Sequence, residues 1–142
     1  MDIQELHEKI LYPVVKIHTA KAGGSGTIIY SKPDPENKDE HQTFIMTCSH
    51  VIEDAISYKK DFHPVLKRDI KKEFLNQVDV EVFDYVYLSH VNSSNSFKAD
   101  IIAYDKSHDI AILKLNSPKK CPYVTKLIHQ TRIKEVKLFM PT

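Results

Sequence analysis

Two residues with acid–base side chains stand beside apolar segments of the chain. His50 comes just after segment 43–47, and Asp109 directly precedes segment 110–115. An imidazole titrates near neutral pH, so it can accept a proton from a nucleophile and later return it. A carboxylate that accepts a hydrogen bond from the second ring nitrogen would fix the tautomer of that imidazole. The two residues lie 59 positions apart, from 50 to 109. They can therefore meet only if strands fold back on one another.

The hydrophobic pattern indicates a short helix followed by strands. Residues 2–11 carry apolar side chains at helical spacing, with Asp2 as the cap and Glu5 three positions later, and Pro13 ends the helix. Strands are predicted at 14–19, 27–30, 43–47, 78–91, 97–104, 110–115 and 134–139, with turns at 22–26 and 92–95. Segment 51–56 reads as one helical turn. Leu66, Ile70 and Phe74 recur every four residues after Pro64, which predicts an inserted helix over 64–77. Six or seven short strands are typical of an all-β antiparallel barrel or sandwich.

Three segments carry a family resemblance when they are taken in order. They are 23–29 (GGSGTII), 43–52 (TFIMTCSHVI) and 99–115, which ends in DIAILKL. Together they resemble the first barrel of trypsin-like serine peptidases, most closely the HtrA/Deg branch. The resemblance covers roughly residues 14–116. It implies a mainly all-β fold, a six- to seven-stranded antiparallel barrel over 14–142. The helix indicated by the hydrophobic pattern, within 1–13, precedes this barrel. The resemblance also implies that His50 is the catalytic base and acid, that Asp109 orients it, and that the substrate is a polypeptide.

The family's nucleophile lies in a Gly-x-Ser-Gly-Gly segment of a second barrel, and this sequence has no such segment. Its three glycines are at positions 23, 24 and 26, so nothing supplies the glycine-rich turn of an oxyanion hole either. We therefore expect an N-terminal half that is inactive alone, and whose partner is the missing second barrel or another protein. An apolar face left by the missing barrel would favour association between copies. The alternatives are a non-catalytic peptidase-like interaction module and a plain β-barrel that matches by chance.

The composition argues against several other classes of partner and site. The 142 residues suit one domain, and 20 basic against 19 acidic residues give no reason to expect a nucleic acid or membrane partner. No secretory signal is visible at the N-terminus, which predicts a cytoplasmic location. Cys48 and Cys121 are expected to be buried core residues rather than a disulfide or a Cys48–His50 catalytic pair. His108 is expected at the surface. The spacing of cysteines and histidines predicts no metal site, and no cofactor is expected.

Overall fold

Strands make up most of the structure, a computed structural model that describes residues 2–37, 39–116 and 121–125. The N-terminal helical segment comprises α1 (Ile3–Leu6) and the π-helical turn η1 (His7–Leu11). Two 3-10 turns follow the third strand, η2 (Ser49–Val51) and η3 (Glu53–Ala55). The strands are β1 (Val14–His18), β2 (Gly23–Pro33), β3 (His41–Thr47), β4 (Ile56–His63), β5 (Arg68–Leu75), β6 (Val78–Tyr87), β7 (His90–Asp105) and β8 (Ile110–Leu115). Within these described ranges, no helix is long and apolar enough to cross a bilayer.

Six of the strands close into an antiparallel barrel, which confirms the predicted fold class. Their order around the barrel is β1-β2-β3-β8-β7-β6, and β6 pairs with β1 to complete the circle. Strands alternate their side chains between two faces, so one face of each strand fills the interior. In β3 and β8 that face consists of Thr43, Ile45 and Thr47, and of Ala111, Leu113 and Leu115. The other core residues include Val15, Ile17, Ile28, Val51, Ile52, Val78, Val80, Ala99 and Ile101.

The glycines are needed because neighbouring side chains lie close to the backbone of β2. None of the three has a positive φ, so backbone freedom is not the reason for them. A Cβ on Gly26 would lie 2.7 Å from both Ile17 Cδ1 and Ile45 Cγ2. A Cβ on Gly24 would lie 2.7 Å from Val51 Cγ2. The turn predicted at 22–26 is therefore mostly strand, and its glycines let the barrel wall and η2 pack closely.

The N-terminal helical segment is confirmed over residues 3–11. Asp2 caps it, since the Asp2 carboxylate accepts a hydrogen bond from the Glu5 N–H at 2.8 Å. The following Tyr12 is buried and stacks on Tyr85 of β6, with ring centroids 4.4 Å apart. The helix therefore connects to the barrel through an aromatic contact.

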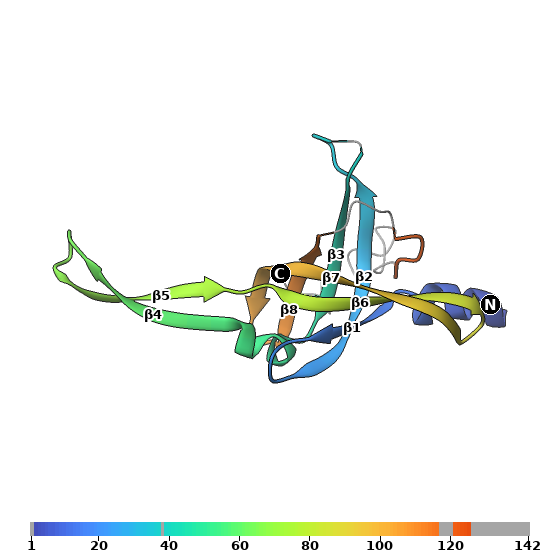
Figure 1. The fold of residues 1–142 in the computed structure, drawn as a ribbon, viewed down its shortest axis with the longest axis horizontal. Coiled ribbons are helices and arrows are strands. Elements are labelled where there is room, and N and C mark those ends of the chain that lie inside the picture. Colours follow the sequence, from blue (N-terminus) through green and yellow to red (C-terminus); the bar gives the residue numbers. More distant parts are fainter. Residues whose placement is uncertain (1, 38, 117–120, 126–142) are drawn as a thin grey trace, which may run out of the picture.

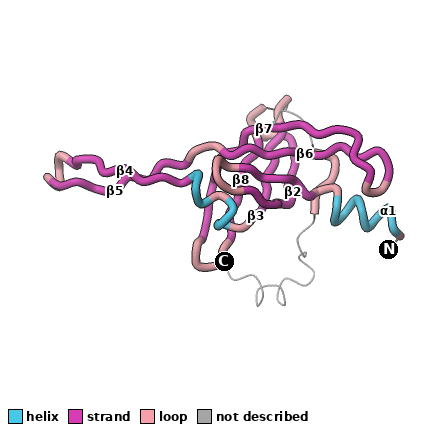
Figure 2. The backbone as a smooth tube through the Cα atoms, turned by 60° about the horizontal axis from the view of Figure 1, so that its bottom comes forward, coloured by secondary structure: helices cyan, strands magenta, loops and turns pink. Residues whose placement is uncertain are grey.

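The inserted helix predicted over 64–77 is wrong. β4 and β5 form a separate two-stranded hairpin that extends away from the barrel, as Figures 1 and 2 both show. Leu66 lies in the turn between these strands, whereas Ile70 and Phe74 lie on one face of β5. A spacing of four is a multiple of the strand period of two, so the pattern could not separate the two structures.

Two smaller expectations change as well. The predicted turn at 92–95 lies inside β7, and the chain reverses at Leu88 and Ser89 instead. Leu88 has a positive φ of 48° there, which its type did not predict. The helical turn expected at 51–56 is present as η2 and η3, beginning two residues earlier. The strand expected at 134–139 lies outside the described residues.

Candidate active site

The pairing of β3 with β8 brings the two candidate catalytic residues together. Thr47, the last residue of β3, is paired with Ala111, the second residue of β8. The chain leaving β3 and the chain entering β8 therefore lie at the same end of the barrel. His50 follows three residues after Thr47, and Asp109 comes two residues before Ala111.

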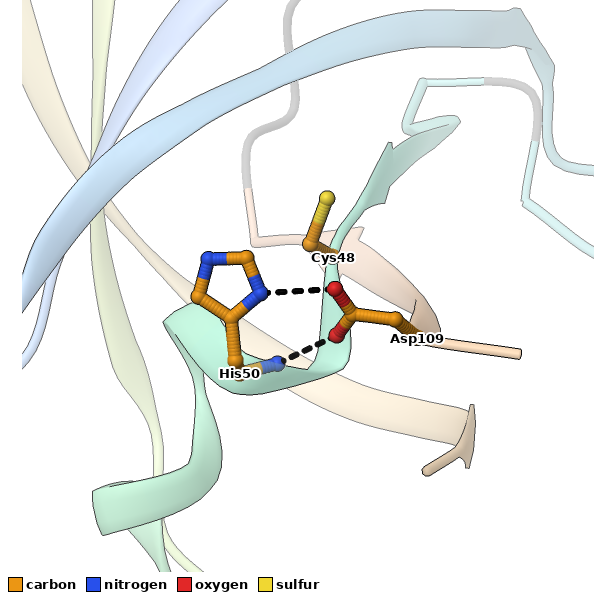
Figure 3. Close-up of side chains that lie close together, drawn as sticks. All are labelled: Cys48, His50 and Asp109. Carbon is orange, nitrogen blue, oxygen red and sulfur yellow. Dashed lines mark hydrogen bonds and ion pairs between the residues drawn. The ribbon is translucent and has the colours of Figure 1, made fainter. Parts of the chain in front are cut away.

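The imidazole of His50 and the carboxylate of Asp109 face each other (Figure 3). His50 Nδ1 lies 2.7 Å from Asp109 Oδ2, within hydrogen-bonding distance. The other carboxylate oxygen, Oδ1, accepts the backbone N–H of His50 at 2.9 Å and the hydroxyl of Ser49 at 3.1 Å. Both oxygens are thus fixed, and the ring is oriented with Nε2 away from the carboxylate.

Asp109 takes an unusual backbone conformation that aims its side chain. Its φ is 55°, in the left-handed region where aspartate is tolerated better than most residues. The preceding turn is closed by Asp105, whose Oδ1 accepts the Ser107 N–H at 2.9 Å. Such turns suit aspartate because its short side chain can bond the backbone two residues on. The turn places Asp109 directly before the first residue of β8, with its carboxylate toward His50.

The bonds from His50 also set the charge of Asp109. The backbone N–H of His50, and then its ring, lower the pKa of the Asp109 carboxyl from its ordinary value of 3.8. Desolvation opposes this shift, and the Ser49 hydroxyl adds to it. Asp109 is therefore ionised at neutral pH and can only accept hydrogen bonds, so a neutral His50 must carry its proton on Nδ1.

We compared the chain with known proteins to identify its fold. No family model matches the chain, and no curated protein matches it. Solved structures do: the Deg5 crystal structure has a TM-score of 0.51 at 17% identity over 89% of this chain. The MamO protease domain from Magnetospirillum magneticum, in its apo form, has a TM-score of 0.50 at 17% identity over 84% of this chain.

The chain has the fold of the HtrA/Deg trypsin-like proteases. The match covers 47% of the length of each of these two solved structures, so the chain spans about half of them. The resemblance inferred from the three sequence segments is confirmed at the level of the fold. In this trypsin-like barrel, the two residues that the motifs singled out are neighbours in space.

Cys48 corrects one expectation about the trypsin-like barrel. Cys121 is buried as predicted, but Cys48 is exposed. Thr43, Ile45 and Thr47 point inward, so alternation turns residue 48 outward. The Cys48 thiol lies beside the His–Asp pair (Figure 3), and one ligand atom from each of Cys48, His50 and Asp109 lies within 4.8 Å of the others. These are donor types that zinc accepts. Sequence spacing missed the group because Asp109 is distant in the chain.

A second His–Asp pair lies next to the site but is a feature of the turn. His108 Nδ1 lies 2.7 Å from Asp105 Oδ2, and the His108 side chain is exposed, as predicted. The hydroxyl and backbone N–H of Ser107 and the ring of His108 lower the pKa of the Asp105 carboxyl. Asp105 and His108 are three residues apart, so the turn alone can bring these two side chains together. The His50–Asp109 pair instead requires β3 and β8 to pair.

Ser49 is the site residue that the sequence did not single out. It is buried, and its hydroxyl donates to Asp109 Oδ1. Its position directly before His50 in the TCSHV segment was the available signal. Among the described residues, no hydroxyl group forms a hydrogen bond with His50 Nε2. Within the described residues, the candidate site therefore consists of a hydrogen-bonded histidine and aspartate, with no hydroxyl group at His50 Nε2.

Proposed function

We propose that this chain supplies the His–Asp pair of a serine peptidase, an enzyme that hydrolyses peptide bonds. One observation carries the proposal: the 2.7 Å contact between His50 Nδ1 and Asp109 Oδ2, with the other carboxylate oxygen held by His50 N–H and Ser49. The similarity of the fold to protease structures supports it.

The geometry suits the role of His50 as a general base. Asp109, held ionised, accepts a hydrogen bond from Nδ1–H, which leaves the lone pair on Nε2 free. Nε2 can then take the proton from a hydroxyl nucleophile as it attacks a carbonyl. The positive charge that develops on the ring lies next to the Asp109 carboxylate, which stabilises it. Nε2 later donates the same proton to the leaving amine.

The nucleophile would approach from the exposed side of His50. The side chain of His50 is 67% exposed, so a hydroxyl group from beyond the described residues has access to Nε2. The oxyanion of the tetrahedral intermediate also needs N–H donors. In trypsin-like triads these donors come with the serine, so one additional structural unit would complete both functions. A polypeptide is the substrate that this chemistry implies.

A second candidate is a non-catalytic interaction module. It is favoured by the lack, within the described ranges, of any hydroxyl bonded to His50. In that case the pair would persist as a structural tie between the end of β3 and the start of β8. The face around His50 would then bind a polypeptide without cleaving it.

Covalent labelling separates these two candidates. The longest polypeptide that the gene encodes would be treated with a fluorophosphonate, which labels a serine only when a neighbouring base activates it. We expect labelling that is lost in His50→Ala and strongly reduced in Asp109→Asn. His18→Ala is the matched control, because His18 is another partly exposed histidine beside an acid, Glu81, at 3.5 Å. Labelling that is absent in the wild type, or unchanged in His50→Ala, would overturn the peptidase proposal.

A further inference from the structure

The β4–β5 hairpin concentrates positive charge in a chain that is nearly neutral. Residues 56–75 contain six basic and three acidic residues, a net charge of +3. The whole chain has 20 basic and 19 acidic residues, so the remainder has 14 and 16, a net charge of −2. The near-zero net charge of the whole chain, from which no membrane partner was expected, is therefore unevenly distributed. The hairpin is a basic arm, and the rest of the chain is acidic. Figures 1 and 2 show that this arm projects away from the barrel.

Like charges stand directly opposite each other in the middle of the hairpin. Lys59 is paired with Lys72, and Lys60 is paired with Lys71. Like charges in such cross-strand positions destabilise a sheet, and an isolated two-stranded hairpin is only marginally stable in water. Placing two such pairs next to each other works against folding of the arm in isolation. A bound anion would remove that repulsion.

Three of these lysines are among the residues that line a hollow on the hairpin. It has a volume of about 470 Å³ and is lined by Tyr58, Lys59, Lys60, Ile70 and Lys71. Lys71 Nζ lies 4.3 Å from the centroid of the Tyr58 ring, so the aromatic ring holds one ammonium group in place. Lys60 and Lys71 are cross-strand partners, so their side chains project from the same face as Tyr58, and their two ammonium groups can bind one phosphate or carboxylate headgroup. Lys59 projects from the other face, where its Nζ lies 5.1 Å from the centroid of the Phe74 ring.

The end of the hairpin is apolar and ordered. Val65 is 82% exposed, Phe62 58% and Leu66 51%. The turn is closed by the Lys67 N–H, which donates to the His63 carbonyl at 2.7 Å, and by the Leu66 N–H, which donates to His63 Nδ1 at 3.1 Å. Large apolar side chains are thus displayed at the point farthest along the arm. An apolar end behind which basic residues gather is the pattern of segments that enter a lipid headgroup layer.

We propose that the β4–β5 hairpin docks this chain on an anionic lipid bilayer. Phe62, Val65 and Leu66 enter the headgroup region. Anionic headgroups bind Lys60 and Lys71 on one face of the hairpin and Lys59 on the other. The acidic remainder of the chain is repelled by the same surface, so the arm attaches end-on and the barrel stays in water. A nucleic acid would use the lysines but would gain nothing from Val65 and Leu66, so the apolar end favours the bilayer.

The sequence offers a clean probe of insertion, because the chain contains no tryptophan. Val65→Trp places a single indole at the end of the hairpin. Val86→Trp is the matched control, since Val86 is 68% exposed in the opposite β6–β7 hairpin. With vesicles of phosphatidylcholine and phosphatidylserine, we expect a blue shift of emission for Val65→Trp and none for Val86→Trp. Equal shifts for both variants, or no shift for Val65→Trp, would overturn the proposal.

Co-sedimentation of the full chain with vesicles tests the two chemical components separately. Lys60→Gln/Lys71→Gln should lower partitioning onto the anionic vesicles about 10- to 30-fold, and Val65→Ser/Leu66→Ser about tenfold. Lys16→Gln/Lys32→Gln, which removes the same charge from exposed barrel lysines, should bind as the wild type does. Equal binding to pure phosphatidylcholine vesicles would overturn the electrostatic part and with it the proposal.

Two further binding experiments test whether a soluble anion, and not a bilayer, is the ligand of the hairpin. Glycerophosphoserine, which carries the headgroup without acyl chains, should compete only weakly. A single-stranded RNA oligonucleotide should bind more weakly than the vesicles and should be insensitive to Val65→Ser/Leu66→Ser. Tighter binding of either soluble anion would replace the bilayer with that ligand. The hairpin proposal does not depend on the peptidase proposal, since His50→Ala should leave vesicle binding unchanged.

Discussion

Asp109 is held through both of its carboxylate oxygens by a single residue, His50. Oδ2 lies 2.7 Å from the ring Nδ1, and Oδ1 accepts the backbone N–H at 2.9 Å. The ring orientation of His50 is therefore tied to the position of its own backbone. Because the pair joins the end of β3 to the start of β8, its formation depends on correct pairing of these two strands.

The first prediction concerns acid stability. The pKa of Asp109 is lowered by its hydrogen bonds to His50. In acid, the folded chain therefore binds fewer protons at this carboxyl group than the unfolded chain does. The stabilisation is present above the ordinary value of 3.8 and is lost as the pH falls below it. Asp109→Asn should therefore be less stable than wild type near neutral pH, and the difference should shrink in acid. Chemical denaturation at a series of pH values measures it, and a difference that stays constant would contradict the assignment.

The second prediction concerns the glycines of β2. Gly26→Ala should lower the free energy of unfolding by about 1–3 kcal/mol, because the new methyl group meets the Ile17 and Ile45 side chains in a packed core. Gly23→Ala is the matched control. Its Cβ would meet only ordinary contacts, at 3.6 Å and beyond, so the change should stay within about 0.5 kcal/mol. Equal destabilisation by the two variants in urea unfolding would show that close packing is not the reason for Gly26.

Gly24 gives a third prediction, one that links packing to the site. Its added methyl group would lie 2.7 Å from Val51, the residue that follows His50 in η2. Gly24→Ala should therefore displace η2 and shift the ring resonances of His50 in NMR spectra. The ring resonances of His18, on β1, should change less. An unchanged His50 spectrum would mean that Val51 moves without η2.

The fourth prediction compares the two thiols. Cys48 is exposed, whereas Cys121 is buried and burial raises the pKa of its thiol. Since the thiolate is the reactive form, iodoacetamide should modify Cys48 much faster than Cys121 in the folded chain. Peptide mass spectrometry after timed labelling gives both rates. Similar rates in the native state, rather than only after denaturation, would contradict the exposed position of Cys48.

The fifth prediction concerns the base of the basic hairpin. The hydroxyl of Tyr104 in β7 donates to the Glu73 carboxylate in β5, and this bond is the largest cause of the raised pKa of Tyr104. Tyr104→Phe should loosen the hairpin while leaving the barrel intact. Hydrogen exchange of the β4 and β5 amides should become faster, and exchange in β3 and β8 should not change. Tyr87→Phe, at an exposed tyrosine, is the control that should alter neither region.

The sequence predicted the barrel and the contact between the two candidate residues because the signals for both are local. Short, continuous apolar runs mark β3 and β8, and the family resemblance of the DIAILKL and TCSHV segments marks Asp109 and His50. The hairpin was misjudged because Ile70 and Phe74, four positions apart, fit a helix and a strand equally well. Cys48 was misjudged because its exposure depends on which face of β3 points inward. The positive φ of Asp109 arises from the turn that Asp105 closes, and no local sequence pattern predicted this conformation.

The protonation of the His50 ring tests the central claim most directly. Free neutral histidine mostly carries its proton on Nε2, whereas an ionised Asp109 next to Nδ1 requires the proton to be on Nδ1. Long-range proton–nitrogen NMR at about pH 8, above the ordinary pKa of histidine, distinguishes the two tautomers. We predict the Nδ1–H form in the wild type and its loss in Asp109→Asn. An Nε2–H tautomer in the wild type would contradict the account.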